Sequence, residues 1–125
     1  MISKTTTMLY VSDPKAAMAF WTEKMGFILI ETQEHSDATS YEIAPSRASN
    51  SKFCIHDKNW VAKHNPGMNT GFPSLLFETE DLKAEYEKLS AAGVSTNPIV
   101  DFQGMTHFTF SDMEGNYMAI KEVKS

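Results

Sequence analysis

The sequence predicts an α+β fold in which one βαβββ module occurs twice. Two observations carry this prediction. In both halves of the chain an apolar, strand-like segment precedes a capped amphipathic helix, and the capping residues Asp13 and Asp81 lie 68 residues apart. The glycines expected to end the two helices, Gly26 and Gly93, lie 67 residues apart, so the two repeats agree to within one residue.

The first module opens with a strand near residues 8–13, where side chains alternate in character. Asp13 followed by Pro14 is typical of a helix start, because aspartate caps free N–H groups and proline needs no hydrogen bond there. Apolar residues then recur at helical spacing as far as Gly26. Further strands are expected at residues 27–31, 38–44 and 52–57.

The second module repeats the pattern with a strand near residues 74–79 and a helix between Asp81 and Gly93. Strands at 105–111 and 117–122 follow, joined by a turn at 112–116. The chain is therefore expected to form one domain over residues 1–125. Its parts are module one at about 4–57, an irregular connector at 58–72 and module two at about 73–123.

Composition limits the classes of function. The chain has 125 residues, with 11 Lys and Arg against 16 Asp and Glu, which gives a net charge of −5. No basic run is present, so neither nucleic acid nor an anionic membrane is an expected partner. No segment is apolar enough for a signal peptide or a membrane span. Cys54 is the single cysteine, which excludes an internal disulfide and favours a reducing, cytoplasmic location.

Short motifs in both modules match one known family in their order and spacing. The matching segments are Val11-Ser12-Asp13, Ala19-Phe20-Trp21, Met25-Gly26-Phe27, Thr79-Glu80-Asp81, Ala91-Ala92-Gly93-Val94, Phe102-Gln103-Gly104-Met105 and Phe108-Thr109-Phe110-Ser111-Asp112-Met113-Glu114-Gly115-Asn116. Over nearly its whole length the chain thus resembles the vicinal oxygen chelate superfamily. This superfamily includes glyoxalase I, extradiol dioxygenases and proteins of fosfomycin and bleomycin resistance.

The resemblance implies two modules that curl into a U-shaped cleft of mixed sheet, commonly in a homodimer. Catalytic members hold a divalent metal with a donor near the start of each module's first strand and another on its last strand. The corresponding positions here are Thr6, Ser74, Cys54 and Ala119. Alanine ligates nothing, the two hydroxyl residues are poor primary ligands, and the thiol is expected to act as a small apolar side chain. Neither a metal nor another cofactor is therefore expected.

Strand alternation separates residues of the core from residues that would line the cleft. The core set is expected to be Leu9, Val11, Phe53, Ile55, Leu75, Phe77, Phe108 and Phe110. The opposite set is apolar and aromatic with a few polar groups, as in a small-molecule pocket, and Trp60 and Phe102 flank it. The expected ligand-binding residues are Tyr10, His56, Trp60, Phe102, Met105, His107, Thr109 and Tyr117. His35 and His64 are expected to be solvent-exposed.

These residues favour a metal-independent protein that binds a small hydrophobic or aromatic molecule, with sequestration of a drug or toxin as one form of that function. The alternative is a glyoxalase-like lyase or isomerase. It would use His56 and His107 as acid and base, because imidazole titrates near neutral pH, or it would use an unrecognised metal site. A third hypothesis is a structural or regulatory homodimer whose cleft is unused.

Overall fold

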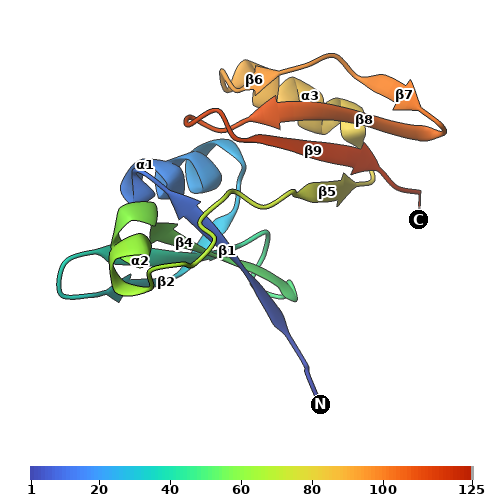
Figure 1. Ribbon diagram of the computed structural model, residues 1–125. Coiled ribbons are helices and arrows are strands. Elements are labelled where there is room, and N and C mark those ends of the chain that lie inside the picture. Colours follow the sequence, from blue (N-terminus) through green and yellow to red (C-terminus); the bar gives the residue numbers. More distant parts are fainter. Residues whose placement is uncertain (125) are drawn as a thin grey trace. The chain divides into compact units, whose positions relative to one another are not determined.

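The computed structural model describes residues 1–124, and the chain divides into two compact units (Figure 1). The first unit is Met1–Pro73 and the second begins at Ser74. Each unit contains one sheet and a helix that packs against it, so the α+β class predicted from the sequence is confirmed. Among the described residues no helix is both long and apolar enough to cross a bilayer.

The first unit is a four-stranded sheet with its strands in the order β1-β4-β3-β2. Strand β1 runs parallel to β4, whereas the pairs β4/β3 and β3/β2 are antiparallel. Its elements are β1 (Thr5–Val11), α1 (Pro14–Ala19), the π-helical segment η1 (Phe20–Lys24), β2 (Ile28–Glu34), β3 (Thr39–Ala44), β4 (Ser51–Asp57) and α2 (Lys58–His64).

The predicted first helix is present, and its capping signals act as expected. The Asp13 carboxylate accepts a hydrogen bond from the backbone N–H of Ala16 at 3.1 Å, and Pro14 occupies the first helical position. The last turn widens into η1, where the N–H of Met25 donates to the carbonyl of Phe20 at 3.2 Å. Gly26 then adopts a φ of 78°, which lets the chain leave the helix.

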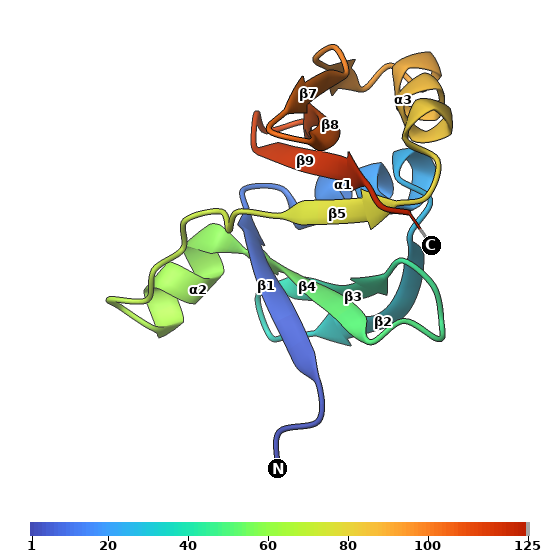
Figure 2. The ribbon, with the colours of Figure 1, turned by 90° about the vertical axis from the view of Figure 1, so that its right-hand side faces the viewer.

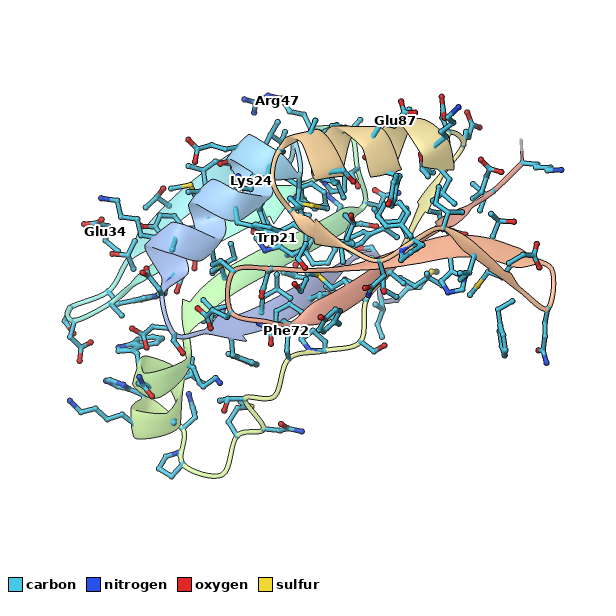
Figure 3. All side chains as sticks on the ribbon, turned by 90° about the horizontal axis from the view of Figure 1, so that it is seen from above. Trp21, Lys24, Glu34, Arg47, Phe72 and Glu87 are labelled. Atoms are coloured by element: carbon cyan, nitrogen blue, oxygen red, sulfur yellow. The ribbon has the colours of Figure 1, made fainter. Side chains whose placement is uncertain are left out.

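The core of the first unit is aromatic and lies between this helix and the sheet. Trp21 is 1% exposed, and its ring stacks on Phe53 of β4 at 6.2 Å and contacts Phe27 at 5.0 Å. Trp21 is labelled in Figure 3. Leu9, Val11, Phe53 and Ile55 are all buried, as strand alternation predicts.

The second unit repeats this plan with short additional strands. Its sheet has the order β5-β9-β8-β6, β7 pairs with β8, and β5 runs parallel to β9. Figure 2 shows α3 alongside this sheet. Its elements are β5 (Leu76–Thr79), α3 (Leu82–Ala91), β6 (Ser95–Thr96), β7 (Val100–Phe102), β8 (Met105–Ser111) and β9 (Tyr117–Glu122).

The signals of the first helix recur in the second unit. Asp81 accepts a hydrogen bond from the N–H of Ala84 at 3.0 Å, and Gly93 has a φ of 83°. Phe108 and Phe110 are completely buried, as predicted. The expected core residues Leu75 and Phe77 are only half-buried.

The predicted turn between β8 and β9 is organised by the buried carboxylate of Asp112. Its Oδ1 accepts hydrogen bonds from the backbone N–H groups of Glu114 and Asn116, each at 2.9 Å. Its Oδ2 accepts a third from the Asn116 side chain, also at 2.9 Å. Gly115 has a φ of 80°, a conformation that suits glycine. The residues that carry the family resemblance here are therefore the ones that build the turn.

The expectation of an irregular connector over residues 58–72 is wrong for its first half, which forms helix α2. Asp57 caps this helix by accepting hydrogen bonds from the N–H groups of Asn59 and Trp60 at 2.9 and 3.1 Å. With seven residues, α2 is too short to show a clear apolar period, so its cap was the one available signal. Strand β1 also begins earlier than expected, at Thr5.

Replacement of Trp21 by alanine is expected to lower the free energy of unfolding by about 3–5 kcal/mol, because it removes the largest buried ring of the first unit and leaves a cavity. Guanidinium denaturation followed by circular dichroism would measure the loss. Met113, which is 44% exposed, provides the control. Met113→Ala should change stability by less than about 0.5 kcal/mol. Equal effects of the two substitutions would contradict this assignment of the core.

Candidate functional site

Three polar side chains of the first unit form a continuous chain on the sheet face that points away from α1. His56 lies on β4, Ser40 on β3 and His35 in the loop between β2 and β3. The register pairs Tyr41 with Ile55, which places Ser40 beside His56, and it pairs Tyr10 with His56 on the other side. Strand pairing therefore brings together residues that are 16 and 46 positions apart in the sequence.

The distances within this chain are those of hydrogen bonds. Ser40 Oγ lies 2.7 Å from His56 Nδ1 and 3.0 Å from His35 Nε2, and the Ser40 side chain is fully buried. At the other end, His56 Nε2 lies 3.2 Å from the sulfur of Met8, which is 43% exposed. We refer to Met8, Tyr10, His35, Ser40 and His56 as the imidazole cluster.

The environment of His56 favours its neutral form. The ring of Tyr10 stacks on His56 with 6.0 Å between the ring centres and 27° between the planes. Desolvation by burial lowers the pKa of His56, and the nearby His35 lowers it further. An imidazole with this pKa carries one proton at neutral pH and is available as a donor on one nitrogen and an acceptor on the other.

Trp60 of α2 supports the cluster from one side. Its indole stacks on His35 at 4.3 Å with 17° between the planes, and its Nε1–H donates to Asp37 at 2.6 Å. Desolvation raises the pKa of the Asp37 carboxyl, but the Trp60 N–H, His64 and Lys63 outweigh it, so this pKa lies below its usual value. The expectation that His35 is solvent-exposed is wrong, because the ring is half-buried between Trp60 and Ser40, whereas His64 is exposed as expected.

Cys54 lies on the same strand face but is chemically quiet. Desolvation raises the pKa of its thiol to about 11, with Glu42 and Glu31 as further causes. The side chain is 4% exposed, and its sulfur lies 4.0 Å from the side-chain oxygen of Gln33. A protonated, buried thiol is a poor nucleophile at neutral pH.

The positions at which the superfamily's catalytic members carry metal donors do not suit a metal here. Thr6 and Ser74 offer hydroxyl groups, Cys54 holds its proton, and Ala119 has no donor atom. Within residues 1–124, no three His, Cys, Asp or Glu side chains are grouped so that they could hold a metal ion. The donor set therefore does not fit the metal that the resemblance implies.

The remaining predicted site residues lie in the second unit. His107 Nδ1 donates to the carbonyl of Met105 at 3.1 Å, and Thr109 Oγ1 accepts from the side-chain amide of Asn97 at 2.7 Å. Phe102 and Tyr117 are each 61% exposed. His56 and His107 thus belong to different units, and their action as a pair stays a prediction.

Comparison with known proteins identifies the family. The sequence pattern of the Glyoxalase/Bleomycin resistance protein/Dioxygenase superfamily matches residues 5–120. The protein YetH of Bacillus subtilis (strain 168) is 32% identical over 119 residues, which cover 94% of this chain and 95% of YetH. The chain therefore belongs to the Glyoxalase/Bleomycin resistance protein/Dioxygenase superfamily.

Solved structures show the same fold. TnmS3, an antibiotic binding protein from Streptomyces sp. CB03234, is 22% identical with a TM-score of 0.79, and the match covers 98% of this chain and 96% of TnmS3. A superfamily member from Sphaerobacter thermophilus is 20% identical with a TM-score of 0.79 and covers 98% of both chains. These likenesses confirm the predicted glyoxalase/bleomycin-resistance fold.

The sequence predicts that Tyr10 and His56 share one strand face, as they do in the structure, but it does not indicate that Ser40, His35 and Asp37 join the same network of contacts. Alternation within strand 38–44 puts Ser40 on the same strand face as Glu42. It gives no further indication that Ser40 has a special role. Its importance follows from its place opposite His56, and that depends on the register between β3 and β4. The signal for His35 is weaker still, because it lies in a loop.

Cys54 should react at least a hundredfold more slowly with iodoacetamide at pH 7.5 in the native protein than in urea, because both its raised pKa and its burial protect it. Mass spectrometry of timed samples would measure both rates. The matched control is a Cys54→Ala, Ser46→Cys double variant, whose single thiol would lie in an exposed loop and should react fast in both states. Fast alkylation of native wild-type protein would contradict the assignment.

Proposed function

We propose that the protein binds a small hydrophobic or aromatic molecule on the strand faces that point away from its helices. The observation that carries this proposal is the set of accessible apolar and aromatic side chains on those faces. Met8 is 43% exposed beside Tyr10 and His56 in the first unit, and Leu76 and Tyr117 are 49% and 61% exposed in the second. Apolar walls with a few well-placed polar groups are typical of small-molecule sites.

We further propose that binding needs no metal ion. The support is chemical, since the four positions that correspond to metal donors in catalytic relatives carry two hydroxyls, a protonated thiol and a methyl group. Recognition would then depend on apolar contact and on the hydrogen-bonding groups of the imidazole cluster. The antibiotic binding protein TnmS3, which shares the fold, indicates what kind of ligand such a scaffold accommodates, although the fold alone does not define the function.

The alternative function is that of a lyase or isomerase in which His56 and His107 act as acid and base. One observation favours it, because His56 Nε2 lies beside Met8, a residue that is 43% exposed. The two functions differ in what happens to the bound compound. A binding protein releases it unchanged, whereas an enzyme converts it, and His107→Ala would abolish that conversion.

Ligand binding should raise the melting temperature of the purified protein. A thermal-shift screen of aromatic antibiotics and aromatic metabolites is expected to find compounds that raise it by several degrees, because a ligand at a hundred times its Kd adds about 2.7 kcal/mol. Tyr10→Ala should weaken the shift, while Met113→Ala on an exposed turn should leave it intact. Recovery of the compound unchanged by mass spectrometry would support binding over catalysis. Failure of every compound to shift the melting temperature would contradict the proposal.

We also propose that the protein is a cytoplasmic homodimer. Three neighbouring apolar side chains support the dimer, because Val100 and Phe102 of β7 are 50% and 61% exposed and Ile99, just before this strand, is 37% exposed. Apolar side chains exposed together on a short strand favour burial against a second chain. The single buried cysteine supports a reducing location.

Sedimentation at micromolar concentration should give a dimer of the 14.0 kDa chain, and Phe102→Asp should shift it toward the monomer. Met113→Asp, which adds the same charge at another exposed apolar position, is the control and should leave the dimer unchanged. A wild-type species near 14 kDa would refute the dimer.

A further inference from the structure

The direction of the hydrogen bonds in the imidazole cluster follows from the Met8 contact when both rings are neutral. The sulfur of Met8 carries no hydrogen, so its contact of 3.2 Å with His56 is a hydrogen bond only if His56 Nε2 is the protonated nitrogen and donates. In a neutral imidazole the other nitrogen then has no proton. His56 Nδ1 must therefore accept.

The acceptor role of His56 Nδ1 determines the next bond. Ser40 Oγ, at 2.7 Å, has one proton and must donate it to His56. The Ser40 oxygen is then left to accept from His35 Nε2 at 3.0 Å, which makes His35 a donor at that nitrogen. The order is thus His35 to Ser40 to His56 to Met8, with one proton on each of the three bonds.

Burial requires Ser40 to stay hydrogen-bonded in either order. Ser40 is fully buried, so its hydroxyl has no water to replace a lost partner, and an unpaired buried hydroxyl costs free energy. If His56 were protonated on Nδ1, Ser40 would have to turn its proton toward His35. That order keeps both hydrogen bonds of Ser40 but sets the lone pair of His56 Nε2 against the sulfur of Met8, which has no proton to donate, so the contact with Met8 is what disfavours it.

We propose that His56 is a hydrogen-bond donor of fixed direction for the ligand, with Ser40 and His35 as positioning residues that keep the proton on Nε2. This inference rests on the proposed binding function and names its ligand class, an aromatic molecule that carries a carbonyl or similar acceptor oxygen. The sulfur of Met8 is a weak acceptor, and a carbonyl oxygen that takes its place forms a stronger bond. The ring of Tyr10, stacked on His56, lies where it contacts the aromatic part.

The position of the proton can be measured without a ligand. Long-range proton–nitrogen NMR spectra of protein labelled with 15N-histidine at pH 7.5, assigned with His56→Gln, should show His56 as the Nε2–H tautomer. Ser40→Ala should give a mixture of tautomers, and Ser40→Thr, which keeps the hydroxyl, should restore the single form. Thr22→Val removes a hydroxyl bonded to the carbonyl of Met18 in the same unit and should change nothing.

The wild-type spectrum tests the inference even if the variants do not fold. An Nδ1–H tautomer or a mixture of tautomers for His56 in the wild-type protein would overturn it. This result would leave the proposed binding function standing, because the thermal-shift screen does not depend on the tautomer.

A matched pair of probes tests the ligand class. Fluorenone and fluorene have nearly the same shape, but only fluorenone has a carbonyl oxygen. Quenching of tryptophan fluorescence should show fluorenone binding about fivefold to tenfold more tightly, the effect expected of one added hydrogen bond. This preference should fall to about twofold or less in His56→Phe and in Ser40→Ala, and it should persist in Thr22→Val.

The outcomes separate the inference from the proposed function. Equal affinities of the wild-type protein for fluorenone and fluorene would overturn the inference and support the binding function. Binding of neither probe would count against both. A preference for fluorenone that survives His56→Phe would show that another group donates to the carbonyl and would overturn the role of His56.

Discussion

The arrangement of each unit depends on a parallel pair formed by its first and last long strands. Strand β1 lies beside β4, and β5 lies beside β9. Parallel neighbours cannot be joined by a tight turn, so the chain must leave the sheet and cross it before returning. The segments that cross are α1 with η1 and α3, and each buries one face of its sheet. The opposite face is thereby left for polar and aromatic side chains.

The imidazole cluster depends on the exact register between β3 and β4. Ser40 meets His56 because Tyr41 lies opposite Ile55. A slip of one residue between β3 and β4 would turn Ser40 toward the helix and bring Ile43 to the polar face. Core packing prevents that slip, because Ile43, Ile55 and Phe53 are buried together on the helix side. The packing of apolar residues on one face therefore maintains the hydrogen bonds on the other.

Much of the fold could be predicted because its signals are local. Asp13 and Asp81 cap their helices, Gly26 and Gly93 end them, and alternation separated Leu9 from Tyr10. The site was only half predictable, since alternation shows the face on which His56 lies but not its neighbours. Ser40 and His35 became recognisable once the strand register was known, and α2 was missed because a short helix leaves no period in the sequence.

The strands of the first unit all precede those of the second unit in the sequence, and this bears on the order in which the two units can fold during synthesis. Every strand pair of the first sheet lies within residues 5–57, and the capping carboxylate of its main helix lies near the start of that segment. All the strands of the first sheet are therefore translated before β5 of the second unit. The protein is thus built so that its halves can fold successively, with the imidazole cluster complete in the half that emerges first.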